Sequence, residues 1–137
     1  DGITFTVPLY SPLGYFTDGD FNTFSYVRYE VASRLLQDYD CVWYMDVDTV
    51  VLSNPFGSYI QSKLDSADVF FQDDIAMPCT GCMLVKNTQP AKDFLQFMWE
   101  SRNSETNDQK HLQTHNVHQN VRYHQVLHSH QMMFLLL

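Results

Sequence analysis

The stretch Cys41-Val-Trp-Tyr-Met-Asp-Val-Asp-Thr-Val-Val-Leu-Ser-Asn-Pro-Phe56 places two aspartates between two apolar runs. The run 41–45 is short and continuous, which is typical of a strand covered on both faces in a parallel sheet. Removing one carboxylate from water costs on the order of several kcal/mol, and two neighbouring carboxylates also repel each other. We therefore expect a cation to lie beside Asp46 and Asp48.

Length and composition indicate one globular domain over residues 1–137. Of the 137 residues, 45% are hydrophobic and 15% are aromatic, enough for a packed core of ordinary size. No repeat, linker or low-complexity tract divides the chain. The net charge of −8 and the presence of only eight Lys and Arg argue against nucleic acid as a partner. A phosphorylated ligand would then need a metal ion to supply positive charge.

Strands and helices alternate along the sequence. The predicted strands are 3–7, 41–45, 67–71 and 81–85. The predicted helices are 22–38, 56–64 and 89–102. Residues 110–131, where Gln, Asn and His are dense, show no period that favours either structure. The alternation predicts an α/β fold with a mostly parallel sheet.

Two of the predicted helices have a core face that can be identified. Asn22 is the candidate N-cap of the first helix. The predicted core face of that helix consists of Phe24, Val27, Val31 and Leu35. Pro90 is tolerated in the first turn of the helix 89–102. The predicted core face of this second helix consists of Ala91, Phe94, Leu95 and Met98.

The three cysteines, Cys41, Cys79 and Cys82, allow one disulfide at most. Cys79 and Cys82 have the CxxC spacing of a redox pair or of half a zinc site. Because no second CxxC exists and the motif does not open a helix after a strand, we favour neither function. The apolar end 132–137 is too short to span a bilayer, and we interpret it as a core strand or a truncation scar.

The two aspartates come at the end of a strand, where open α/β sheets bind their ligands. If the backbone stays extended, Asp46 and Asp48 point to the same side and can converge on one hard cation. Mg²⁺ or Mn²⁺ is favoured, because both prefer oxygen ligands and share them with substrate phosphates. The alternative is that Asp46 caps the next turn while Asp48 is solvated.

Two enzyme classes place Asp-x-Asp after an apolar strand. Asp46-Val-Asp-Thr-Val50 fits the opening motif of haloacid-dehalogenase phosphatases, in which Asp46 would be the nucleophile. That motif normally opens its domain, whereas here it follows a long amphipathic helix, and the Ser/Thr and Lys motifs of that class are missing. The other class is the GT-A glycosyltransferases, in which the acidic pair holds a metal on the diphosphate of a nucleotide sugar.

Three blocks of sequence resemble the nucleotide-diphospho-sugar transferases, in particular glycogenin-like retaining enzymes and plant cell-wall xylosyl- and arabinosyltransferases. The blocks are Phe24–Arg28 with Tyr39–Pro55, then Cys79–Thr88, then Asn107-Asp108-Gln109. They follow the family order and cover most of residues 20–110. The resemblance implies a three-layer GT-A fold that lacks its first strand-helix unit. It also implies a metal-dependent hexosyl- or pentosyltransferase that moves a sugar from a nucleotide-diphosphate donor to a hydroxyl of a glycan or glycoprotein, with retention.

The resemblance assigns roles to the residues that match these blocks. Asp46 and Asp48 would bind the metal. Arg28 would contact the donor diphosphate or the acidic pair, and the alternative is a plain surface arginine. Thr80 and Gly81 would form a tight turn that faces the sugar and the acceptor, where glycine permits close approach of the backbone.

Further roles fall on acidic and amide side chains. Asp108 would lie near the transferred sugar with Gln109 beside it, and the alternative is that Asp108 caps the following segment. Among Gln72-Asp73-Asp74, which ends a strand, we assign contact with donor or acceptor hydroxyls to Asp73, with a solvated acid as the alternative. No residue stands out as a covalent nucleophile, which fits attack on the same face assisted by the leaving phosphate.

The C-terminal part departs from the family. The usual C-terminal metal-binding histidine motif is missing, and His128 or His130 is a candidate third ligand by position only. The chain also begins after the unit that would build the base pocket, so we interpret it as a fragment, a degenerate copy or a reduced member. A non-catalytic nucleotide-sugar-binding remnant of the same fold is the alternative function. Location in the Golgi lumen is implied by the resemblance alone.

Overall fold

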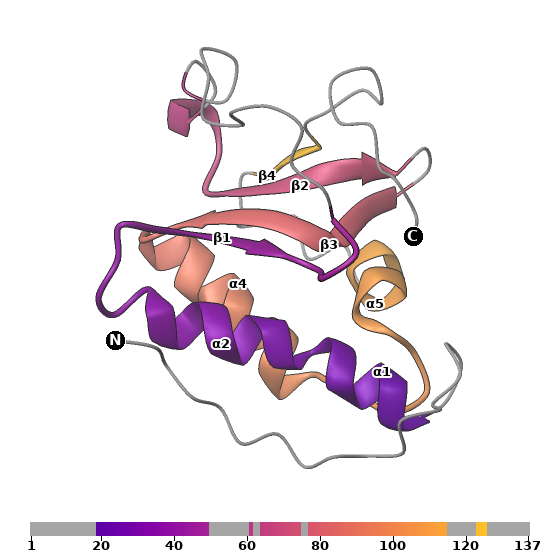
Figure 1. Ribbon diagram of the computed structural model, residues 1–137. Helices are drawn as coiled ribbons and strands as arrows, with labels where there is room; N and C mark the ends of the chain where they lie inside the picture. The colour runs from indigo at the N-terminus through magenta and orange to yellow at the C-terminus, as the bar shows by residue number, and fades with distance from the viewer. Residues whose placement is uncertain (1–18, 50–60, 62–63, 75–76, 115–122, 126–137) are drawn as a thin grey trace.

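Four strands form one sheet in the computed structural model of the chain (Figure 1). The structure describes residues 19–49, 61, 64–74, 77–114 and 123–125. The strands are β1 (Cys41–Met45), β2 (Val69–Asp74), β3 (Met77–Lys86) and β4 (Tyr123–Gln125), in the order β1-β3-β2-β4. The helices are α1 (Gly19–Ser25), α2 (Val27–Leu35), α4 (Gln89–Glu100) and α5 (Asp108–Thr114), with a 3₁₀ helix η1 (Leu64–Ser66). This mixture is consistent with the predicted α/β fold.

The prediction of a mostly parallel sheet is wrong for the described strands. β3 lies between β1 and β2 and is antiparallel to both, while β4 is parallel to β2. Only residues 75 and 76 separate β2 from β3, and a connection that short can join only antiparallel neighbours. A continuous apolar run carries no information about direction. The prediction that strand 41–45 is covered on both faces is also wrong, because Val42 is the one buried residue of β1 and Cys41 is exposed.

An irregularity in β3 brings its first half to the end of β1. Phe71 of β2 pairs with Met83, but the next residue, Gln72, pairs with Cys79, so the register passes over 80–82. On its other side, β3 pairs Cys82 with Met45, the last residue of β1. The bulge therefore places residues 80–82 beside the point where β1 ends, and it replaces the tight turn predicted at 80–81.

The predicted helix 22–38 consists of two helices, α1 and α2, joined at Tyr26. Asn22 lies inside α1 and is not its N-cap. The buried hydrophobic positions are Tyr26, Tyr29, Ala32 and Leu36. Of the predicted core face, Leu35 packs against the core, Val27 and Val31 are half-buried, and Phe24 is 52% exposed, so the prediction is right only in part. The buried face carries tyrosines because their hydroxyl groups find hydrogen-bond partners inside the fold.

The helix predicted at 89–102 is confirmed as α4. Its buried residues are Ala91, Phe94, Leu95 and Met98, as expected from the spacing. Pro90 lies in the first turn, where its missing N–H removes no bond within the helix. Figure 1 shows α4 and α2 packed together against one face of the sheet.

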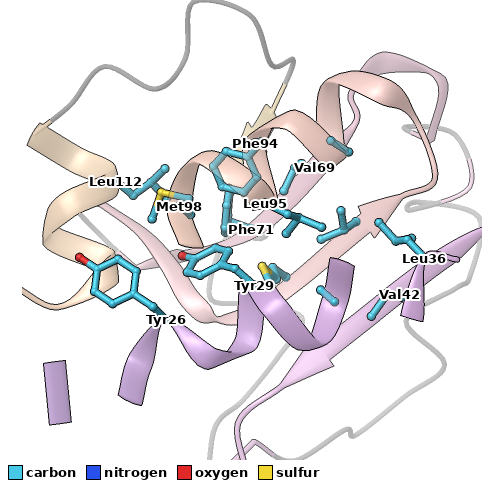
Figure 2. Close-up of a cluster of buried hydrophobic side chains, with 14 residues drawn as sticks. Tyr26, Tyr29, Leu36, Val42, Val69, Phe71, Phe94, Leu95, Met98 and Leu112 are labelled. Carbon is cyan, nitrogen blue, oxygen red and sulfur yellow. The ribbon is translucent and has the colours of Figure 1, made fainter. Parts of the chain in front are cut away.

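The main core lies between these helices and the sheet (Figure 2). Its strand residues are Val42, Val69, Phe71, Met83 and Val85. The strand positions between them, including Phe70 and Leu84, belong to a second cluster on the opposite face. Figure 2 shows Leu36 and Val42 at one end of the main core and the two tyrosines Tyr26 and Tyr29 towards the other, where Leu112 joins from α5.

Several predictions concern residues outside the described ranges. They are the strand 3–7, most of the helix 56–64, the apolar end 132–137, His128 and His130. Within 110–131, where the sequence favours no structure, the described residues form the end of α5 and β4. No helix among the described residues is long and apolar enough to cross a membrane.

All three cysteines lie in the described part of the chain, and none forms a disulfide. Cys41 is exposed and Cys82 is buried. Burial, with smaller contributions from its neighbours, raises the pKa of the Cys82 thiol. A buried thiol with a raised pKa is a poor nucleophile.

Candidate active site

The candidate site begins where β1 ends. The strand stops at Met45, and the following residues form a turn in which the Thr49 N–H donates to the Asp46 carbonyl oxygen at 3.0 Å. The Asp46 N–H donates to the Gly81 carbonyl oxygen at 2.7 Å. Backbone hydrogen bonds thus fix Asp46 between its own turn and the bulge of β3.

The turn changes the relation between the two aspartates. We expected Asp46 and Asp48 to point to one side because an extended strand would place them so, but the backbone is not extended here. The Asp46 side chain is 37% exposed, and Asp48 is exposed. Val47 between them is fully exposed. Both carboxylates can therefore reach solvent. If they bind one ion, the turn after β1 must bring them together, and not the alternation of an extended strand.

Two side chains contact the Asp46 carboxylate. The Tyr44 hydroxyl donates to Asp46 Oδ1 at 2.7 Å. Arg28 Nη1 lies 3.6 Å from Asp46 Oδ2. Burial, together with the hydrogen bond to Asp46, raises the pKa of Tyr44 to about 12 even though Arg28 acts in the opposite direction. Tyr44 therefore stays protonated and donates this hydrogen bond at neutral pH.

Gly81 of β3 lies directly beside the Asp46 carboxylate. A Cβ atom at position 81 would lie 2.5 Å from Asp46 Oδ2 and 3.2 Å from Asp46 Cγ. Real Cβ contacts are not that short, so only glycine leaves room for the carboxylate in this position. The close approach predicted at Gly81 was to a sugar and an acceptor and stays a prediction, whereas the contact observed here is with Asp46, across β1 and β3.

Arg28 of α2 lies between two carboxylates. Its Nε donates to the Ser25 carbonyl oxygen at 2.8 Å and lies 3.4 Å from Asp108 Oδ2. The guanidinium carbon is 5.0 Å from the centre of the Tyr44 ring. The side chain is only 11% exposed, so the surface alternative is wrong and the pairing with Asp46 is the arrangement observed.

The surroundings of Arg28 keep its guanidinium charged. One of its N–H donors, Nη1, makes no hydrogen bond with a described residue. Burial alone would lower the pKa of Arg28, but Asp108, Tyr44 and Asp46 together raise it above its ordinary value. Nη1 is also buried. A buried guanidinium donor without a partner costs free energy, so this atom can take an acceptor beyond those that the described residues supply.

Asp108 is the first residue of α5 and is fixed by α1 and α2. The Tyr29 hydroxyl donates to Asp108 Oδ2 at 3.0 Å, and the Asp108 N–H donates to Ser25 Oγ at 3.2 Å. The helix is capped by Asn107, whose Oδ1 accepts from the Lys110 N–H at 2.9 Å. The capping alternative for Asp108 is therefore wrong, because its carboxylate, which is 3% exposed, faces Arg28 and Tyr29.

Buried tyrosines extend this network toward α5. Burial and the nearby Asp108 raise the pKa of Tyr29 well above its ordinary value and that of Tyr26 to about 12. The Tyr26 hydroxyl lies 2.8 Å from His111 Nδ1 and 3.1 Å from the Thr106 carbonyl oxygen. These contacts hold the start of α5 against the two N-terminal helices.

The remaining predicted residues are placed as follows. Thr80 lies inside β3 and is 2% exposed. Gln109 is half-buried in the first turn of α5. The backbone of Asp73 belongs to β2 opposite Pro78. The structure thus brings together Arg28, Asp46, Gly81 and Asp108.

Sequence reasoning missed the tyrosines that serve this cluster. Tyr44 stands two residues before Asp46 on a strand, so alternation along the strand could have placed it on the same side. Tyr29 follows Arg28 directly, and its position three residues after Tyr26 gives helical spacing to a pair of tyrosines. A search for polar-tipped aromatic residues at core spacing would have found both.

The donor set can be tested against a metal ion. Among the described residues, no group of three His, Cys, Asp or Glu side chains is placed to hold a metal. The carboxylates of Asp46 and Asp48 offer oxygen donors that reach solvent. Mg²⁺ keeps several waters and is commonly bound through one or two carboxylates plus substrate phosphates. The residues present fit that open mode of binding.

The comparisons with known proteins agree with this chemistry. A family model described as nucleotide-diphospho-sugar transferase matches residues 7–135, which include the whole candidate site. Comparison of the chain with curated proteins and with solved structures gave no match. Because the matched range spans nearly the entire sequence, the chain belongs to the nucleotide-diphospho-sugar transferase family.

Proposed function

We propose that this chain is a metal-dependent glycosyltransferase that moves a sugar from a nucleotide-diphosphate donor to an acceptor hydroxyl, with retention of configuration. Membership of the family supports glycosyl transfer as the activity. The observation that carries the rest is the convergence of Arg28 with the carboxylates of Asp46 and Asp108 beside the bulge at Gly81. Acidic and basic groups that meet at a strand end are suited to a ligand carrying phosphates and hydroxyls.

In this proposal Asp46 and Asp48 hold Mn²⁺ or Mg²⁺. The chain has a net charge of −8 and few basic residues, so its own side chains supply little charge for a diphosphate. When bound, the cation would stabilise the negative charge that grows on the leaving diphosphate. Tyr44 and the Gly81 carbonyl fix the carboxylate and the backbone of Asp46 before any ligand binds.

Arg28 and Asp108 would serve the donor. Nη1 of Arg28 makes no hydrogen bond with a described residue. It could donate one to a phosphate oxygen of the donor. Asp108 holds the other side of the guanidinium, and Gln109 would lie with it near the transferred sugar. Contact of Thr80 and Asp73 with sugar or acceptor hydroxyls belongs to the same proposal and rests on the family resemblance.

The alternatives differ in what they require of Asp46. A phosphatase of the haloacid-dehalogenase class would need Asp46 as a nucleophile, and the family match supports transfer instead. A non-catalytic binding remnant would need only the metal and nucleotide contacts. The burial of Asp108 fits this remnant, because a carboxylate that is 3% exposed would serve a bound donor through Arg28 and not by direct contact. Placement in the Golgi lumen rests on the resemblance.

The experiment is a calorimetric titration of the full chain with Mn²⁺ and then with a panel of nucleotide-diphosphate sugars. We expect donor binding that requires Mn²⁺, followed by slow metal-dependent release of sugar to water or transfer to an acceptor. Asp48→Ala should weaken Mn²⁺ binding at least about tenfold. Loss of a residue that only hydrogen-bonds to a metal ligand already weakens binding by roughly that factor, and Asp48 is proposed to be a ligand itself. Asp40→Ala, at another exposed aspartate near β1, is the matched control and should bind Mn²⁺ like the wild type.

Three results would separate the possibilities. Metal-dependent donor binding without turnover would identify the binding remnant. Phosphatase activity that is lost in Asp46→Asn would identify the phosphatase. Equal Mn²⁺ affinity in the wild type and in Asp48→Ala would overturn the proposed metal site.

A further inference from the structure

Tyr44 contacts both charged groups at the end of β1. Its hydroxyl donates to Asp46 Oδ1, and its ring lies under the guanidinium of Arg28. Resting on the function proposed above, we infer that Tyr44 is a positioning residue: its hydroxyl orients the Asp46 carboxylate for the metal, and its ring holds Arg28 in place. In this role Tyr44 acts through its two neighbours and touches neither donor nor acceptor.

The Tyr44 hydroxyl restricts the orientation of the Asp46 carboxylate, which is exposed to solvent on one side. The torsion that rotates a carboxylate about its last bond is broad, so Asp46 needs an external partner to hold one orientation. Its side chain is 37% exposed, and the open side gives no steric restraint. Gly81 bounds the Oδ2 side, and the Tyr44 hydroxyl at 2.7 Å fixes Oδ1. The orientation presented to a metal therefore depends on that hydrogen bond.

The ring restricts Arg28 from a second direction. The Nε edge of the guanidinium is held by the Ser25 carbonyl oxygen and by Asp108. The Tyr44 ring covers a face of the same group at 5.0 Å, within the range of a cation–π contact. With one edge and one face fixed, Nη1 stays 3.6 Å from Asp46 Oδ2 without a hydrogen bond to a described residue.

Two substitutions separate the roles of hydroxyl and ring. Tyr44→Phe removes the hydrogen bond to Asp46 and keeps an aromatic face under Arg28. Tyr44→Leu removes both contacts. Tyr39→Phe is the matched control, because it deletes the hydroxyl of a tyrosine that is 56% exposed and lies before β1.

Each role has its own readout in the full chain. The affinity for Mn²⁺ is measured by electron paramagnetic resonance of the free ion and reports the Asp46 carboxylate. The NMR resonance of the Arg28 Nε–H reports the ring, because an aromatic face shifts the signal of a group lying over it. A merely structural role for Tyr44 would lower the melting temperature and move both readouts together in both variants.

We expect Tyr44→Phe to weaken Mn²⁺ binding about tenfold, the usual effect of losing a partner that orients a metal ligand. The Arg28 resonance should stay in place in Tyr44→Phe and move in Tyr44→Leu, and Tyr39→Phe should match the wild type in both measurements. Wild-type Mn²⁺ affinity in Tyr44→Phe would overturn the role of the hydroxyl, and an unmoved resonance in Tyr44→Leu would overturn that of the ring. A wild type that binds no Mn²⁺ would instead overturn the metal site, a failure distinct from either.

Discussion

Asp46 and Asp108 flank the same guanidinium, but the two ends of the Arg28 bridge are built differently. Asp108 lies at the start of α5, with its side chain 3% exposed. Its carboxylate accepts a hydrogen bond from the Tyr29 hydroxyl, and its N–H donates one to Ser25 Oγ. Asp46 lies in a turn after β1, with its side chain 37% exposed and one tyrosine as donor. One carboxylate is enclosed by protein groups, and the other is half open to solvent.

This difference separates stability from ligand binding. A buried ion pair becomes strongly destabilising when one partner is removed, because the other charge stays buried without compensation. A half-exposed carboxylate loses less, because water replaces its partner. An ionised carboxylate has about four acceptor sites, so Asp46 retains sites for a ligand after binding Tyr44. We therefore expect Asp108 to matter chiefly for folding and Asp46 chiefly for the metal.

The largest expected effect is the loss of stability in Asp108→Ala. The substitution removes the nearer carboxylate, leaves Asp46 Oδ2 at 3.6 Å from Arg28, and removes the acceptor of the Tyr29 hydroxyl. The free energy of unfolding should fall by about 3 kcal/mol, the lower end for breaking a buried pair, because one carboxylate remains. Urea unfolding followed by circular dichroism measures this change.

The comparison itself provides the control for that measurement. Asp46→Ala removes the other partner of Arg28 at a half-exposed site and should cost about 1 kcal/mol or less. Equal losses in the two variants would show that burial does not distinguish the two carboxylates. An unfolding curve of Asp108→Ala equal to that of the wild type would show that Asp108 does not stabilise the fold. The proposed role of Asp108 near the transferred sugar would then be favoured.

The second effect is specific to Asp46 and comes from Gly81→Ala. The new methyl group would lie 2.5 Å from Asp46 Oδ2, so the carboxylate must turn away from its place over β3. Because the atom that must move is the end of a side chain, stability should change little, while Mn²⁺ affinity should fall about tenfold, or about 1.4 kcal/mol. Calorimetric titration with Mn²⁺ measures the loss.

A double-mutant cycle checks the cause of that loss. In a chain that already carries Asp46→Ala, the methyl group at position 81 has no carboxylate to displace. Adding Gly81→Ala to Asp46→Ala should then change Mn²⁺ affinity by no more than the error of additivity, roughly 0.5 kcal/mol. A full second loss in the double variant would mean that the alanine disturbs β3 itself.

The elements whose burial follows a simple period could be predicted from the sequence. The spacing in α4 gives its four buried residues because each apolar position faces the same packed surface. The strands β1 and β3 are also predicted within a few residues, because short apolar runs favour strands, although most of β3 is buried and most of β1 is not. Strand direction could not be predicted, because it depends on the short connection between β2 and β3 and on the position of β3 between two neighbours.

The site shows the same division. The sequence blocks nominate Arg28, Asp46 and Asp108, but they do not show that the Arg28 guanidinium lies between the two carboxylates, which are 62 positions apart (108 − 46). The bulge in β3 that lifts Gly81 to Asp46 leaves no periodic signal, because it is a shift of register between two strands. The tyrosines were missed because an aromatic ring at core spacing is interpreted as part of the hydrophobic core. The sequence does not show that the hydroxyl groups donate hydrogen bonds to Asp46 and Asp108.

The third effect depends on pH and belongs to the Asp108 end. The pKa of Tyr29 is raised well above its ordinary value and that of Tyr26 to about 12, so both hydroxyls ionise at lower pH in the unfolded chain than in the folded one. Their contribution to stability is complete below pH 10 and is lost as the pH rises above it. Each such tyrosine costs at most about 1.4 kcal/mol per pH unit. Urea unfolding at a series of pH values should show this decline, and Tyr29→Phe should have a shallower slope than the wild type. A slope that Tyr29→Phe leaves unchanged would place the alkaline loss elsewhere.

The smallest effect comes from an ion pair on the same helix as Arg28. Arg34 and Glu30 form a pair four residues apart on α2, with side chains 60% and 27% exposed. Glu30→Gln keeps the shape and removes the charge, and it should lower the free energy of unfolding by less than about 0.5 kcal/mol, because water screens an exposed pair. The loss should also shrink further in high salt. Arg28 and Arg34, the basic partners of the two pairs, both lie on α2, so a much smaller cost of Glu30→Gln than of Asp108→Ala would support burial of the Arg28 bridge as the cause. A loss at Glu30 as large as that at Asp108 would remove burial as the explanation for the difference between the two ends of the site.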